Sequence, residues 1–275
     1  MKGLKKIALI SAIAAVSAGA QAELKSLDDA VMSDLTGQAG VSIELTTQVK
    51  IAEFKYTDEG SFSVSDITIG GASQDQTFVS GVDASGNYVY TTVAGGTNLD
   101  DLVINIDINA GGDAEIKLAT LTGLPIDFGV STGAMSLSGT DGTSVLLSSL
   151  SMDGLLFQLD IVADNGTAIV GATSDAALTI DAEFIVSDLD ADVSFLAVGL
   201  EDVRITGNGA HGGAQVGVSM YATTAVGSAS ALGIQVDDLY LNVDMPIVKI
   251  GGTSIGKVAL NGVQLNNTVL KVYGH

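Results

Sequence analysis

The sequence has no cysteine and no tryptophan, only two prolines and two histidines, and few basic residues. Without cysteine, disulfides cannot stabilise the chain, so its stability must come from sheet packing or from assembly. Lys and Arg number 11 against 32 Asp and Glu, which gives a formal net charge of −21. Phosphate backbones and anionic lipid surfaces repel such a chain, and this excludes nucleic acid as a partner class.

Long apolar runs are also missing, except near the N-terminus. There, three lysines within the first six residues precede an apolar stretch that ends at Ala20-Gln21-Ala22. This pattern predicts a secretory signal peptide over residues 1–22, cleaved between Ala22 and Glu23. The apolar stretch is shorter than the roughly 20 residues that span a bilayer. We therefore expect an exported protein without transmembrane helices, and a mature chain with a net charge near −24.

What is abundant is period-two alternation of apolar and polar residues, from residue 41 to residue 275. Hydrophobic residues make up 47% of the chain, enough to build a core. Short runs such as "LVINIDINAGG" and "TSVLLSSLSMDG" each end on Gly-Gly, Asp-Gly or Asn-Gly, which favour tight hairpin turns. The pattern predicts an all-β domain over residues 41–275, an elongated antiparallel β-sandwich or β-roll. Pro125 and Pro246 are expected near strand starts or turns.

One stretch of this domain departs from the pattern. Residues 70–98 are rich in Ser, Gly, Asn and Thr, and "VDASGNYVY" is typical of a hairpin tip. We expect an exposed excursion here, either a recognition loop or a plain solvated turn.

The junction "LKSLDDAVMSDLTGQAGVSIEL" joins two periodicities. Ser26 suits a helix N-cap, and Leu27, Val31 and Leu35 form one apolar stripe. Gly37 follows as a C-cap. Residues 23–40 are thus expected to form a short helix and a glycine-rich hinge. Three turns are too short to be stable alone in water, so the stripe must dock on another surface.

An amphipathic strand follows the hinge. Its apolar face is expected to carry Val41, Ile43, Leu45, Val49 and Ile51. The apolar phase changes after Ile51, which suggests a bulge or a break. Two interpretations stay open: the strand belongs to its own sheet, or it completes the sheet of a neighbouring subunit, as in exported pilins.

The same junction resembles the N-terminal signature of exported Gram-negative pilus-assembly proteins of the FilA type. The resemblance covers about one-tenth of the chain. The matching residues are Leu24, Leu27, Asp29, Met32, Ser33, Thr36, Gly37, Gln38, Gly40 and Val41. The resemblance implies a surface or fibre-associated role.

Catalytic and metal-binding patterns are weak. His211 lies in the glycine-rich "GNGAHGGAQ", which offers little to fix its ring, and His275 ends the chain. No triad is recognisable, so we expect no enzyme and no cofactor. Asp188, Asp190 and Asp192 share one face of a predicted strand, and a solvated acidic face is preferred there over calcium, which takes six to eight oxygen ligands.

Three functional classes follow. The preferred one is an exported structural or adhesion component of a cell-surface fibre or pilus, which assembles through sheet edges with itself or with other surface subunits. The rivals are an outer-membrane β-barrel, disfavoured because aromatic residues make up only 5% of the chain, and a periplasmic or surface binder of lipid or hydrocarbon. Cell surface, outer membrane and periplasm are all compatible with these classes.

Overall fold

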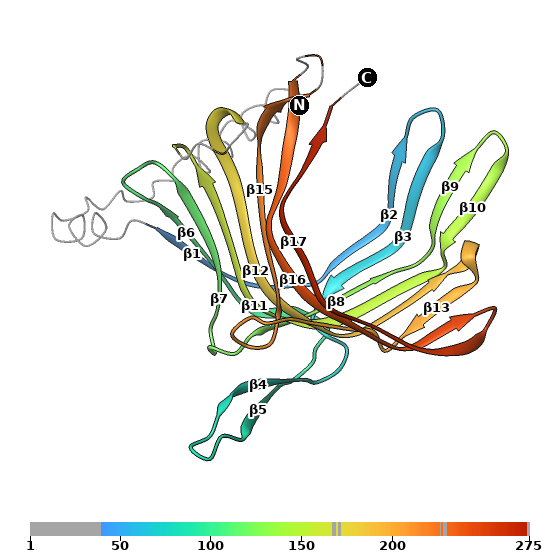
Figure 1. Ribbon diagram of the computed structural model, residues 1–275, viewed down its shortest axis with the longest axis horizontal. Helices are drawn as coiled ribbons and strands as arrows, with labels where there is room; N and C mark the ends of the chain where they lie inside the picture. The colour runs from blue at the N-terminus through green and yellow to red at the C-terminus, as the bar shows by residue number, and fades with distance from the viewer. Residues whose placement is uncertain (1–39, 167–168, 170–171, 226, 228–229, 274–275) are drawn as a thin grey trace, which may run out of the picture. The chain divides into compact units, whose positions relative to one another are not determined.

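The computed structural model describes residues 40–166, 169, 172–225, 227 and 230–273 (Figure 1). Over these ranges the chain is almost entirely antiparallel β-structure, with one short 3-10 helix, η1 (Ser194–Leu196). The prediction of an antiparallel all-β fold is therefore confirmed. The expected short helix and glycine-rich hinge over residues 23–40, except Gly40, lie outside the described residues, as do the helix docking residues and the cleavage site.

Fifteen of the strands form one main sheet, and two form a separate hairpin. In chain order the strands are β1 (Val41–Thr47), β2 (Val49–Thr57), β3 (Ser61–Gly70), β4 (Gln76–Val82), β5 (Tyr88–Val93), β6 (Leu99–Ile108), β7 (Ala114–Thr120), β8 (Ile126–Thr132), β9 (Met135–Gly139), β10 (Gly142–Leu147), β11 (Ser149–Asp164), β12 (Ala172–Val193), β13 (Val198–Glu201), β14 (Arg204–Thr206), β15 (Ala214–Thr224), β16 (Ser230–Ile250) and β17 (Thr253–Val272).

The main sheet is an up-and-down meander of eight lines, some of which are interrupted and so count as two or three strands. The lines are β1 with β2, β3 with β6, β7 with β8 and β9, β10 with β11, β12, β13 with β14 and β15, β16, and β17. Each line pairs antiparallel with the next one along the chain. Among the described strands, the β1/β2 line and β17 each have a partner on one side only.

The interruptions of these lines lie at one level across the sheet, here named the midline. The register shows it: Thr47 pairs with Leu99, while Val49, two residues later, pairs with Ile69 on the far side of a long insertion. Along the midline lie Gln48, segment 71–98, segment 121–125, Phe157, segment 207–213, Asn242 and Gly262. The long strands β11, β12 and β16 bend near this level (Figure 1).

The best-buried apolar side chains gather close to the midline. Leu155 in β11 is 1% exposed and Val186 in β12 is 2% exposed, and they are the largest fully buried side chains of the described residues. Ile126 and Leu102 are also buried and lie beside the insertions. Much of the core therefore lies in a band at the bend, and further buried residues such as Val64, Tyr221 and Val248 lie farther along the strands.

Two details of the predicted strands are wrong. Asp153-Gly154 was expected to close a strand, but both residues lie inside β11, where the register shifts by a bulge. Glycine is required there because a Cβ on Gly154 would lie 2.2 Å from the Ile185 carbonyl oxygen. Pro246 lies inside β16 rather than near its start or a turn. The register also shifts beside it, and such a bulge tolerates the lost N–H.

Candidate functional site

Three insertions that are far apart in the sequence meet at the midline. Segment 71–98 carries the hairpin of β4 and β5, segment 121–125 joins β7 to β8, and segment 207–213 joins β14 to β15. Between them lies a cavity of about 540 Å³. It is lined by Phe78, Ser80, Thr91, Leu118, Ala119, Thr120, Gly123, Leu124, Pro125, Ile126, Leu156, Phe157, Gln158, Leu159 and His211. No lining residue carries a carboxylate, although the chain is acidic.

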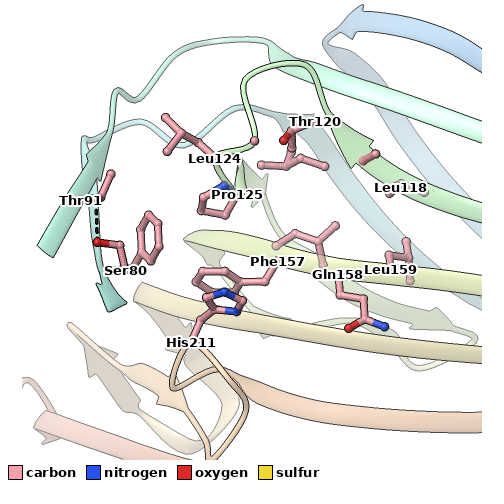
Figure 2. Close-up of a pocket in the computed structure, with 15 residues that line it drawn as sticks. Ser80, Thr91, Leu118, Thr120, Leu124, Pro125, Phe157, Gln158, Leu159 and His211 are labelled. Carbon is pink, nitrogen blue, oxygen red and sulfur yellow. Dashed lines mark hydrogen bonds between the residues drawn. The ribbon is translucent and has the colours of Figure 1, made fainter. Parts of the chain in front are cut away.

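Aromatic rings form one wall of this cavity. The ring of His211 stacks on Phe157, with centroids 4.6 Å apart and planes 2° from parallel. Phe78 meets Phe157 edge to face at 5.3 Å. Figure 2 shows the stacked pair facing Leu124 and Pro125 across the cavity. Apolar and aromatic surface with a few hydroxyl and amide groups is typical of small-molecule pockets, and the volume falls in their usual range.

His211 is held in place, contrary to the expectation that its glycine-rich turn leaves the ring unfixed. Its backbone N–H donates to Glu183 Oε1 over 2.8 Å, and its Nδ1 lies 3.5 Å from the same oxygen. Glu183 is buried, and glycines at positions 209 and 213 let the turn wrap closely around it. Two hydroxyls of the cavity lining bond to each other: Thr91 Oγ1 donates to Ser80 Oγ over 2.8 Å (Figure 2).

The base of the 71–98 excursion is anchored and buried, while its hairpin tip is exposed. Asp127 Oδ2 accepts the backbone N–H of Ala72 over 2.7 Å, and Asp153 Oδ2 accepts that of Ser73 over 3.0 Å. Gln76 is 3% exposed and accepts a bond from the Ser187 hydroxyl. The expectation of an exposed excursion therefore holds only for the tip.

Burial raises the pKa of the Asp127 carboxyl, against the hydrogen bond from Ala72, which lowers it. At the tip, Asp83 Oδ1 accepts the N–H groups of Ser85 and Asn87 over 2.8 and 2.9 Å, which closes the predicted turn. The hydrogen bonds from Asn87 contribute most to lowering the pKa of Asp83.

The N-terminal strand pairs within its own chain. Residues 41–47 form β1 against β6, and residues 49–57 form β2 against β3. The line breaks at Gln48 rather than after Ile51, and Gln48 Nε2 donates to the Thr97 carbonyl over 2.9 Å. The predicted apolar residues, Val41, Ile43, Leu45, Val49 and Ile51, are all exposed, because this line is an edge of the sheet.

The opposite edge, β17, is a candidate interface that the sequence reasoning missed. Among the described residues, 28 large hydrophobic side chains are exposed, and half of them lie on the two edge lines. On β17 these are Ile255, Val258, Leu260, Leu265, Val269, Leu270 and Val272. A sequence signal existed, since no Asp or Glu follows Asp244. The two open edges are therefore apolar, and β17 is also free of negative charge.

An acidic cluster lies elsewhere on the sheet. Carboxylate oxygens of Asp188, Asp190 and Asp202 lie within 4.8 Å of one another, and these three residues are the acidic cluster below. The prediction placed Asp192 with Asp188 and Asp190, but Asp192 instead accepts a bond from the Ser148 hydroxyl over 3.0 Å. Burial, then Asp190 and Asp202, raise the pKa of Asp188.

Comparison with known proteins gives one partial match. A family of unknown function, DUF6160, matches residues 1–110, a span that runs from the N-terminus through β6. No curated protein and no solved structure matches the chain. No helix among the described residues is long and apolar enough to cross a membrane. Over its first 110 residues the chain is thus similar to a family whose function is not known.

Proposed function

We propose that the protein is an exported structural or adhesion component of a cell-surface fibre or pilus, which assembles through the open edges of its sheet. The observation that carries the proposal is the pair of apolar edge lines. The β1/β2 line exposes seven large hydrophobic side chains, and β17 exposes seven more. Backbone N–H and C=O groups along a free edge are ready to pair with another strand.

Edge strands of monomeric proteins usually carry charge, proline or short lengths that prevent such pairing. Here the two edges do carry charged side chains, but the net negative charge of the chain lies elsewhere. Residues 149–244 contain fourteen acidic side chains and one basic one, Arg204, whereas β17 has two lysines and no acid. The β1/β2 line has two Glu and two Lys, so its formal charge is zero. The net negative charge makes two copies of the chain repel each other. Neither of these two lines carries net negative charge, so the copies are able to approach along them.

Two further features support this role. The predicted signal peptide supplies export, and the N-terminal resemblance to FilA-type pilus-assembly proteins supplies a fibre context. The partners we propose are other copies of the chain or other surface subunits. We also propose that the bent meander acts as a rolled sheet rather than a sandwich, because its fifteen strands form one continuous hydrogen-bonded network.

Sedimentation velocity of the purified protein tests the proposal. Val41→Lys places a charge on the β1/β2 edge and should shift high-mass species towards monomer. Val82→Lys is the matched control, because Val82 has the same 58% exposure but lies on the β4/β5 hairpin. The control should associate like the wild type. A wild-type protein that stays monomeric at all concentrations would refute assembly.

The midline cavity supports a second candidate function, the binding of a small apolar or aromatic molecule. Its volume and its Phe78, Phe157 and His211 wall favour such a ligand. Mass spectrometry of the purified protein should then detect a copurified lipid or hydrocarbon that Phe157→Ala loses. Equal ligand content in the wild type and the variant would contradict this role.

A further inference from the structure

We infer that the β1/β2 line of one copy pairs antiparallel with β17 of the next copy, so that assembly is head to tail. The inference rests on the proposed function and names the partner of each edge. Among the described strands of the main sheet, β1, β2, β10 and β17 have a partner on one side only. β10 has six residues, whereas the β1/β2 line and β17 span 17 and 20 residues. The two long edges therefore offer the extended ladders.

The topology suits this arrangement. Eight antiparallel lines put the first and the last in opposite directions, because each line reverses the one before it. A second copy in the same orientation then brings its β1/β2 line antiparallel to β17, and the up-and-down alternation continues across the contact. A contact between two different surface patches leaves one patch of each kind free at the ends of the assembly. Such a contact builds a ring if the rotation between copies closes, and otherwise an open fibre.

The midline sets the register of this contact. Gln48 and Gly262 are the midline positions of the two edges, and Gly262 has φ +67° in the β17 bulge. When these two residues are placed opposite each other, Leu45 faces Leu265 and Val41 faces Val269. The bend then runs on from one copy to the next.

The same register pairs opposite charges. Glu53 falls opposite Lys257, whose Nζ also contacts Asp244 at 2.8 Å within its own chain. A lysine ammonium has three donors, so it is able to bind both carboxylates. Two-fold pairing about the same midline residues, of β17 with β17 or of β1/β2 with itself, leaves every charged side chain of these edges opposite an uncharged one. Head-to-tail pairing is thus the arrangement that gains an ion pair.

Disulfide trapping tests this pairing in a chain that has no cysteine of its own. Leu45→Cys and Leu265→Cys are made as two separate full-length proteins, purified under reducing conditions, mixed and then oxidised. One protein carries a mass tag. Because the two cysteines are in different chains, closure of a single chain on itself cannot give the product. Residues opposite each other in an antiparallel ladder have Cα atoms about 4.5–5.5 Å apart, which suits a disulfide.

The expected main product is the Leu45→Cys/Leu265→Cys heterodimer, with little homodimer from either protein alone. Circular dichroism checks that both variants keep the wild-type strand content. Homodimers of Leu265→Cys as the main product would show β17-to-β17 pairing and overturn the inference. Wild-type assembly without the heterodimer would overturn the inference and leave the proposed function standing. Failure of the wild type to associate would overturn both.

A charge swap gives an independent readout. Glu53→Lys should weaken association about two- to fivefold, the range of a single cross-strand ion pair. Adding Lys257→Glu should restore part of it, because the pair between copies is rebuilt with reversed signs while the contact of Lys257 with Asp244 is lost. A double variant that associates no better than Glu53→Lys alone would contradict the proposed register.

Discussion

Replacement of Asp188 by asparagine should stabilise the protein at neutral pH. Asp188 lies in β12 directly opposite Asp153 in β11, and it forms the acidic cluster with Asp190 and Asp202. Its Oδ1 atom is buried and has no hydrogen-bond partner. Burial contributes most to raising the pKa of Asp188, with Asp190, Asp202 and Asp153 adding to it and Arg204 opposing it. Asparagine keeps the size of the side chain and removes the charge.

The gain in the free energy of unfolding can be estimated from the cross-strand pair of Asp153 and Asp188. A cross-strand pair of opposite charges stabilises a ladder by about 0.2–1 kcal/mol and like charges directly opposite destabilise it, so with the neighbouring carboxylates we expect a gain of about 1 kcal/mol. For a domain of this size that corresponds to a rise in melting temperature of about 2–4 °C. Asp141→Asn is the matched control, since Asp141 is exposed in the turn between β9 and β10. Its melting temperature should not change.

The pH dependence supplies the decisive readout. Because the pKa of Asp188 is higher in the folded than in the unfolded chain, the folded state binds more protons between the two values. The contribution of Asp188 to the free energy of unfolding therefore falls as pH rises through that interval. The advantage of Asp188→Asn should be full at about pH 7 and vanish below 3.8, the usual aspartate pKa.

Calorimetry or urea denaturation should compare all variants at one protein concentration, because association shifts apparent stability. A melting temperature of Asp188→Asn below that of the wild type at neutral pH, both in the presence and in the absence of calcium, would refute the reasoning. If the loss appears only when calcium is present, a bound cation rather than a solvated acidic face explains the cluster.

Three further outcomes are expected. Leu155→Ala should lower the free energy of unfolding by about 2–5 kcal/mol in urea titrations, while the exposed Leu137→Ala changes little. Gly154→Ala should also destabilise the protein, since its Cβ would meet the Ile185 carbonyl oxygen at 2.2 Å; a wild-type melting temperature would show that the bulge relaxes freely. Chelator should leave the melting temperature unchanged, because each residue of the acidic cluster brings one carboxylate oxygen to it, and calcium takes six to eight; a clear drop would contradict this.

Local patterns predicted the strands well where turn chemistry and alternation agree. Gly111-Gly112 was expected to end a strand, and β6 and β7 are joined there, with Gly112 at φ +89°. Asp153-Gly154 carries the same kind of signal but lies within β11. A glycine needed for a turn and a glycine needed for close approach to a neighbouring strand look alike in a sequence. The neighbour of Gly154 is on β12, about thirty residues away.

For the candidate sites too, some features are visible in the sequence and others depend on which strands pair. The amphipathic strand that begins at Val41 was visible in the sequence, because period two is a local property of the chain. That it is an edge, and that β17 is the other edge, depends on which strands pair. The cavity was not predictable, because Phe78, Phe157 and His211 come from three distant segments that only the shared midline brings together.

The β-class, the alternation of the strands, the absence of acidic residues after Asp244 and the short turns follow from local patterns in the sequence, since each depends on neighbouring residues. Only the tertiary structure decided that the N-terminal strand belongs to its own sheet, that the interruptions align along one midline, and that two apolar lines stay open. These features depend on pairings between residues far apart in the chain, and cross-strand packing and hydrogen bonding select them only once the whole meander has formed.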